Sequence, residues 1–179
     1  MPDCDHEEAD SRICVHVKDA LVRTVDTDVI VILVGIYFCL HSMYPNANIW
    51  VGFGTGKHYQ NYHINAICEQ LGKPKSTALP FYHTFTGCDT TSQFLGKGKK
   101  SCWDAWKSNP EVTEAFHFLV DRPFQLLELN SPVFALLERY TCILYDKTTM
   151  MSSVNELRQE LFCKKSKIMD NIPPTQVTN

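Results

Sequence analysis

The chain has 179 residues, of which 44% are hydrophobic and 21% are charged, and its formal net charge at pH 7 is -3. This length and composition predict one folded domain with an appended piece and exclude a mainly disordered chain. The longest apolar run, 29–40, is shorter than the roughly 18 residues that a membrane-spanning helix needs, so we expect a soluble protein with no membrane partner.

Acidic residues gather at one end of the chain. Residues 1–28 hold eight acidic and three basic residues, a local net charge of -5. The eight cysteines stand at wide, unrepeated spacings without a Cys-x-x-Cys pair, and the acidic N-terminus carries no secretory segment. We therefore expect reduced, mostly buried thiols in an intracellular protein.

The first predicted elements lie before residue 60. Apolar residues at helical spacing predict a helix over 6–20, and a strand is expected to begin at Leu21. The β-branched run 29–34 is typical of a central strand covered on both faces, and 49–53 predicts a second strand. The glycine-rich stretch 52–58 is interpreted as a hairpin or loop, because it lacks two residues of the phosphate-binding P-loop motif.

The second half of the chain is predicted to be helical. Residues 62–71 carry an apolar stripe that stops at Gly72, and further helices are expected over 76–85 and around Trp103 and Trp106. Capping residues, two of them followed by proline, indicate three more helix starts. These starts are Asn109-Pro110, Ser131-Pro132 and Ser153 to Glu156, the last for a helix that ends near Cys163.

Acidic residues recur where strand ends and helix ends should meet. On extended chain, two carboxylates two positions apart project from the same side of the backbone, and ligands of open parallel sheets lie outside the carboxyl ends of strands. Converging carboxylates repel one another unless cations bind, and oxygen ligands suit Mg²⁺ or Mn²⁺. Alternatively, these acids cap a turn and form a solvated helix face. The residues are Glu8, Asp10, Asp26, Asp28 and Asp89.

Three short acidic motifs resemble those of the flap-endonuclease (XPG-like) branch of the PIN-domain nucleases. Glu8-Ala9-Asp10, Asp26-Thr27-Asp28 and Gly87-Cys88-Asp89 occur in the order of that family's Glu-Ala-Glu, Asp-x-Asp and Gly-Ser-Asp motifs. The resemblance covers about residues 6–107, and the chain is also similar to a group of invertebrate proteins that share HEEAD, DTDV, FTGCDTTS and GKGK.

The resemblance implies an α/β, three-layer, PIN-like fold with a mainly parallel sheet and a helical C-terminal extension. It divides the chain into a nuclease core at 1–108, a helical extension at 109–165 and a loose tail at 166–179. Family members carry a strand with another catalytic Asp and a lysine-bearing arch before the first motif. Since Met1 stands only seven residues before Glu8, we expect an N-terminally truncated member of the family.

The resemblance also implies an activity, the hydrolysis of nucleic-acid phosphodiesters by water with two Mg²⁺ or Mn²⁺ ions. Two such ions about 4 Å apart suit this reaction. The substrate expected is duplex or branched DNA, and a nuclear location of this intracellular protein would be consistent with it. The alternative, given the truncation, is a non-catalytic nucleic-acid-binding or scaffold module. The metal ligands implied are Glu8, Asp10, Asp26, Asp28 and Asp89, of which Asp10, Asp28 and Asp89 are catalytic.

A basic glycine turn, Gly96-Lys97-Gly98-Lys99-Lys100, follows the last acidic motif. In the family, an element resembling a helix-hairpin-helix grips the duplex backbone here, so the resemblance implies phosphate contacts by the two glycines with the lysines nearby. A glycine turn before a helix can aim N–H groups at a phosphate, and such contacts position a duplex without reading its sequence. An ordinary solvated turn is the alternative. For the nearby tryptophans, core packing is favoured over base stacking.

Two other kinds of site are weaker. The seven histidines show no paired spacing such as His-x-x-x-His, which argues against a zinc site. Cys88, five residues after His83, is a conceivable nucleophile, but a small buried residue at the family's serine position is the favoured interpretation.

Overall fold

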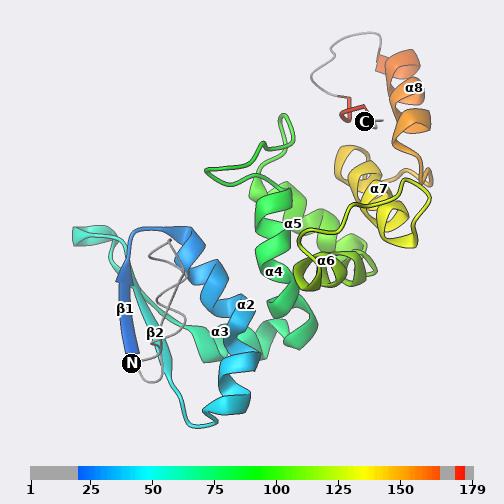
Figure 1. Ribbon diagram of the computed structural model, residues 1–179. Coiled ribbons are helices and arrows are strands. Elements are labelled where there is room, and N and C mark those ends of the chain that lie inside the picture. Colours follow the sequence, from blue (N-terminus) through cyan, green and yellow to red (C-terminus); the bar gives the residue numbers. More distant parts are fainter. Residues whose placement is uncertain (1–19, 166–171, 176–179) are drawn as a thin grey trace. The chain divides into compact units, whose positions relative to one another are not determined.

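The computed structural model describes residues 20–165 and 172–175 (Figure 1). In this part the protein is an α/β protein with a three-stranded sheet and seven α-helices, and it is mostly helical. The described residues pack into two units, one up to Pro80 and one from Phe81 onward. These two units are defined by packing alone. The functional borders predicted at 108/109 and 165/166 are a separate matter and stay predictions.

The sheet belongs to the first unit and is mixed. Its strands are β1 (Ala20–Thr24), β2 (Ile49–Phe53) and β3 (Gln60–His63), in the order β1-β2-β3. β1 and β2 are parallel, whereas β2 and β3 are antiparallel. The sequence prediction of β2 is confirmed. β3 was not predicted, and the stretch before it is a loop with a single 3-10 turn at Gly56–His58.

The prediction of a central strand over 29–34 is wrong, because these residues lie in the helix α2 (Thr27–Met43). The run is apolar on almost every side, so its periodicity does not separate a buried strand from a buried helix. Its length decides, since 17 residues exceed an ordinary strand and suit a helix packed in a core. Asp26 begins this helix as its N-cap residue.

The core of the first unit lies between the sheet and two helices, α2 and α3 (Ile64–Leu71). α3 ends at Gly72, whose φ of 75° is a conformation that glycine adopts readily, as the sequence predicts. Burial of these side chains is the main stabilising contribution to the unit. The cluster consists of Val29, Leu33, Val34, Tyr37 and Leu40 of α2, Ile49 and Val51 of β2, and Ile64 and Cys68 of α3.

α4 (Lys73–Phe85) begins three residues before the predicted start at 76. It lies against α2 where α2 carries Gly35: a Cβ at this position would be 2.4 Å from Cγ of Pro80. The close approach of the two helices therefore requires a glycine in the middle of α2, although glycine lowers helix propensity by about 1 kcal/mol.

The second unit is helical. Beyond the end of α4 it contains α5 (Lys99–Ser108), α6 (Val112–Asp121), α7 (Pro132–Tyr145) and α8 (Val154–Lys165). The predicted start at Ser131 is confirmed, because its side chain accepts a hydrogen bond from Phe134 N at 3.2 Å. No helix in residues 20–165 and 172–175 is long and apolar enough to cross a membrane.

Aromatic side chains fill the core of the second unit. Phe116 lies 5.3 Å from Trp106 and 5.6 Å from Tyr140, measured between ring centroids, and all three side chains are fully buried. Trp106 donates its indole N–H to Thr113 Oγ1 at 2.8 Å. Core packing is therefore confirmed for Trp106, and Trp103, which is half-buried, packs edge-on against it.

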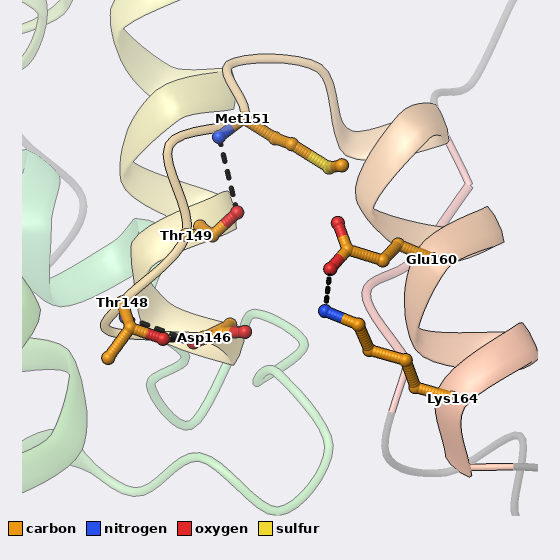
Figure 2. Close-up of polar contacts among 6 residues, drawn as sticks. All are labelled: Asp146, Thr148, Thr149, Met151, Glu160 and Lys164. Atoms are coloured by element: carbon orange, nitrogen blue, oxygen red, sulfur yellow. Dashed lines mark hydrogen bonds and ion pairs between the residues drawn. The ribbon is translucent and has the colours of Figure 1, made fainter.

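Polar contacts hold the connection between α7 and α8 (Figure 2). Asp146 Oδ1 accepts hydrogen bonds from the backbone and hydroxyl of Thr148, and Lys164 pairs with Glu160 within α8. Arg139 Nη1 donates to the backbone oxygens of Thr149 and Met151 at 2.9 and 2.6 Å. The guanidinium thus fixes a turn that has no regular secondary structure.

Candidate functional site

Asp26 and Asp28 lie where β1 ends and α2 begins. Thr24, the last residue of β1, accepts a hydrogen bond at its Oγ1 from Asp26 N at 2.9 Å. Asp26 Oδ1 in turn accepts from Asp28 N at 2.9 Å, which makes Asp26 the N-cap residue. Both carboxylates therefore stand at the carboxyl end of a parallel strand and at the positive end of a helix dipole.

Asp26 and Asp28 lie close together, but not on extended chain as their spacing in the sequence predicts. Only Asp26 has extended backbone angles, with φ -98° and ψ 128°, whereas Asp28 is in the first helical turn. The alternation of side chains along a strand therefore does not apply to the pair. A capping turn places them instead, so the capping interpretation is confirmed for Asp26, with the metal interpretation still to be tested.

The other three predicted ligands lie outside the described residues of the first unit. Glu8 and Asp10 lie outside the part of the chain that the structure describes, and Asp89 belongs to the second unit. Among residues 20–165 and 172–175, no three His, Cys, Asp or Glu side chains are grouped closely enough to hold a metal ion. Asp26 and Asp28 supply the hard oxygen donors that Mg²⁺ and Mn²⁺ prefer, and the five-residue ligand set stays a prediction.

The predicted Gly87-Cys88-Asp89 motif forms a tight loop just after α4, and Asp89 is exposed in it. Gly87 has a φ of 94°, and a Cβ here would be 2.4 Å from Cβ of Gln93. Thr91 closes the loop, since its hydroxyl donates to Thr84 O at 2.7 Å and accepts from Cys88 N at 3.0 Å. The first residue of the motif is thus required by backbone geometry.

Cys88 is half-buried, and the sequence-based expectation of a buried thiol is wrong for it. Its Sγ lies 3.4 Å from Thr90 Oγ1 and 3.3 Å from Thr91 Oγ1. Hydrogen bonds from these two hydroxyls lower the pKa of the Cys88 thiol. The two threonines were not singled out from the sequence, although Thr two or three positions after a turn residue commonly bonds back to it.

The basic glycine turn leads into α5, with Gly98 as its N-cap residue and no side-chain cap. Two of its three lysines contact the protein itself. Lys97 Nζ lies 4.8 Å from the ring centroid of Tyr145, and Lys99 Nζ donates to His83 O and to Thr86 Oγ1 at 2.5 and 2.8 Å. The predicted phosphate contacts therefore depend mainly on Lys100, which is exposed, and on backbone N–H groups near Gly96 and Gly98.

A further surface, not singled out from the sequence, lies on the sheet. Ile49 and Val51 of β2 point into the core, so Trp50 and Gly52 point to the opposite side, which we name the outer face. Trp50 is 42% exposed and stacks on His63, its partner on β3, with 4.3 Å between ring centroids and 10° between ring planes. On β1, Leu21 is in register with Trp50 and is 59% exposed.

The next row of the outer face is centred on Gly52. A Cβ at Gly52 would be 2.1 Å from the hydroxyl of Tyr59, so the phenol ring lies directly over the glycine. Arg23, in register with Gly52, has its Cζ 5.5 Å from the Tyr59 ring centroid. The outer face thus holds three aromatic rings and a guanidinium side by side. The sequence could have shown this surface only if β3 had been predicted.

Comparison with known proteins adds no assignment. A scan against protein-family models finds no match, and no curated protein or solved structure matches the chain significantly. The candidate function therefore depends on the residues and the geometry described above.

Proposed function

We propose that this protein is a metal-dependent, nuclease-like protein that acts on phosphodiesters of duplex or branched DNA. The observation that carries the proposal is the position of Asp26 and Asp28 at the carboxyl end of the parallel strand β1, at the start of α2. Ligands of open α/β sheets bind at this end of the strands. The resemblance of the three acidic motifs to those of the flap-endonuclease branch of PIN-domain nucleases points to the same pair.

Asp26 and Asp28 would hold Mg²⁺ or Mn²⁺ together with Glu8, Asp10 and Asp89, and Asp10, Asp28 and Asp89 are the proposed catalytic residues. Bound ions of this kind activate water and stabilise the leaving oxygen. The chain's own contribution is to position carboxylates: the capping hydrogen bond that Asp28 N donates fixes one oxygen of Asp26. The amino end of α2 favours negative charge at both residues.

The basic turn has a separate role in this proposal, which is to hold the phosphate backbone of the substrate. N–H groups at the start of an α-helix have no partner within the helix, and Gly98 supplies no side chain that would occupy them at α5. Lys100 adds a cation beside these groups. Such contacts position a duplex without selecting its sequence.

The test is cleavage of a labelled flapped duplex by the full chain, with and without Mn²⁺. We expect cleavage only with Mn²⁺, and we expect Asp28→Asn to abolish it, since the substitution removes a carboxylate but keeps the size of the side chain. Asp121→Asn, an exposed acid at the end of α6, is the matched control and should cleave as the wild type does. Equal behaviour of wild type and Asp28→Asn rejects the enzymatic proposal.

A non-catalytic nucleic-acid-binding or scaffold module is the second candidate. The observation that favours it is that Asp26, one of the proposed ligands, has a structural role as the N-cap residue of α2. This candidate predicts that wild type and Asp28→Asn bind the flapped duplex with equal affinity in EDTA and that neither cleaves it in Mn²⁺.

A further inference from the structure

The outer face of the sheet, defined by Leu21, Arg23, Trp50, Tyr59 and His63, has the chemistry of a base-stacking surface. The exposed indole of Trp50 is held in place by stacking on His63. Tyr59 lies against the backbone of Gly52, so its ring is also held in place. Proteins that bind unpaired nucleic acid use aromatic rings fixed in this way, because every base has a π-face that can stack.

The charge of this part of the chain fits a polyanion. None of the three strands carries Asp or Glu, and neither does the loop from Gly54 to Tyr59 between β2 and β3. The cationic side chains there are Arg23 and Lys57, and both are exposed. A purely apolar partner would leave these two cations desolvated without a counter-charge, which is costly, whereas phosphates pair with them.

We propose that the outer face binds an unpaired DNA strand, with bases stacked on Trp50 and Tyr59 and phosphates contacted by Arg23 and Lys57. The choice of DNA rests on the proposed function, in which branched DNA is the substrate. The unpaired arm of such a substrate needs its own binding surface, because the basic turn at α5 contacts only backbone phosphates. β1 carries Arg23 three residues before Asp26, so a DNA strand bound on this face ends next to the proposed metal ligands.

The first test measures binding without cleavage. The full chain in EDTA is titrated into a fluorescently labelled single-stranded thymidine oligonucleotide, and fluorescence anisotropy gives the affinity. Stacking of a base is worth roughly 1–3 kcal/mol, and about 1.4 kcal/mol corresponds to tenfold in affinity. We therefore expect Trp50→Ala to weaken binding about tenfold or more and Trp50→Phe to keep most of it. Arg23→Gln should weaken binding and reduce its salt dependence.

Two controls separate stacking from charge and from misfolding. Phe124→Ala removes an aromatic ring that is 98% exposed in the second unit and should leave the affinity unchanged. Inorganic polyphosphate, which has charges but no bases, should compete with the oligonucleotide equally well for wild type and for Trp50→Ala. Titration with the oligonucleotide should quench wild-type tryptophan fluorescence, and this quenching should be absent in Trp50→Phe, which keeps Trp103 and Trp106.

Unchanged affinity of Trp50→Ala, as expected if a protein partner or another part of the chain covers this face, overturns the inference. So does tighter binding of an RNA oligonucleotide of matching length. The inference and the proposed function fail separately. Trp50-dependent binding in EDTA without any cleavage in Mn²⁺ removes the nuclease proposal alone, and cleavage with a KM that Trp50→Ala does not change removes the stacking surface alone.

Discussion

The carboxylate of Asp26 accepts a hydrogen bond from the backbone N–H of Asp28, with 2.9 Å between Oδ1 and N. An N-cap residue of this kind satisfies one of the N–H groups that the first turn of a helix leaves unpaired. The acid therefore has a structural role whether or not it binds a metal ion. The two roles can be separated, because capping needs an acceptor atom whereas cation binding needs a negative charge.

We expect Asp26→Ala to lower the free energy of unfolding by about 1 kcal/mol, the usual cost of losing a side-chain cap. Asp26→Asn should change it by only a few tenths of a kcal/mol, since Asn is as good a capping residue as Asp. Urea denaturation followed by circular dichroism measures both values. The capping role is wrong if both variants are as stable as the wild type.

The same two variants test metal binding. If Asp26 is a ligand, Asp26→Asn binds Mn²⁺ more weakly than the wild type while unfolding at nearly the same urea concentration. Isothermal titration calorimetry with MnCl₂ gives the Mn²⁺ affinity of each protein. Retention of wild-type Mn²⁺ affinity in Asp26→Asn leaves Asp26 with the capping role alone.

A second pair of variants concerns two glycines with positive φ, Gly87 inside the FTGCDTTS segment and Gly96 after it. At Gly96, φ is 70° and no heavy atom lies within 4 Å of an added Cβ, so Gly96→Ala should cost only the backbone strain, about 1–2 kcal/mol. Gly87→Ala adds a clash, because the new Cβ would be 2.4 Å from Cβ and 2.7 Å from Cα of Gln93. We expect the larger loss for Gly87→Ala in urea denaturation, and a larger loss for Gly96→Ala would contradict the described loop.

Where the sequence carried strong local signals, the fold could be predicted. β2 is a short, mainly apolar segment that follows turn residues, Ser131-Pro132 marks the start of α7, and Gly72 marks the end of α3. The run that begins at Val29 lacked such a signal, because β-branched residues favour strands locally while the packing of a long apolar segment favoured a helix. Asp26, interpreted as a capping residue, was the better local indicator, because it marks the start of α2.

The site was less predictable, since its contacts join residues that are far apart in the chain. Nothing in the sequence around Lys97 shows that its ammonium group lies over the ring of Tyr145. The stacking of Trp50 on His63 depends on β3, whose sequence Gln-Asn-Tyr-His is mainly polar and has only Tyr62 as a residue typical of strands. Pairing in the sheet, which overrides such local preferences, made this surface.

Stability should fall in alkaline solution because of buried thiols. Burial raises the pKa of Cys68 and Cys142 from the ordinary value of 9.0 to about 11. Between these values the unfolded chain has released thiol protons that the folded chain keeps, so the unfolded state binds fewer protons and stability falls as pH rises. Below pH 9 these thiols are protonated in both states and do not make the free energy of unfolding depend on pH. Burial also raises the pKa of Tyr82 and Tyr140, which adds to the loss at still higher pH.

The measurement is the free energy of unfolding by urea, under reducing conditions, at pH 8, 9.5 and 10.5. We expect it to decrease over this series and to decrease less steeply in Cys68→Ala, whose stability at pH 8 serves as its own reference. A pH dependence identical to that of the wild type would show that Cys68 does not contribute.

The aromatic core of the second unit gives the largest expected effect of a single substitution. The ring of Phe116 packs against those of Phe81, Phe85, Trp106 and Tyr140 at centroid distances of 5.6, 5.9, 5.3 and 5.6 Å. Phe116→Ala leaves a cavity that these neighbours cannot fill without losing contacts elsewhere, and such changes cost about 3–5 kcal/mol. Phe124→Ala removes a ring that is 98% exposed and should change the unfolding free energy by less than about 0.5 kcal/mol. Urea denaturation of the two variants side by side tests this core, and similar losses in both would contradict the burial of Phe116.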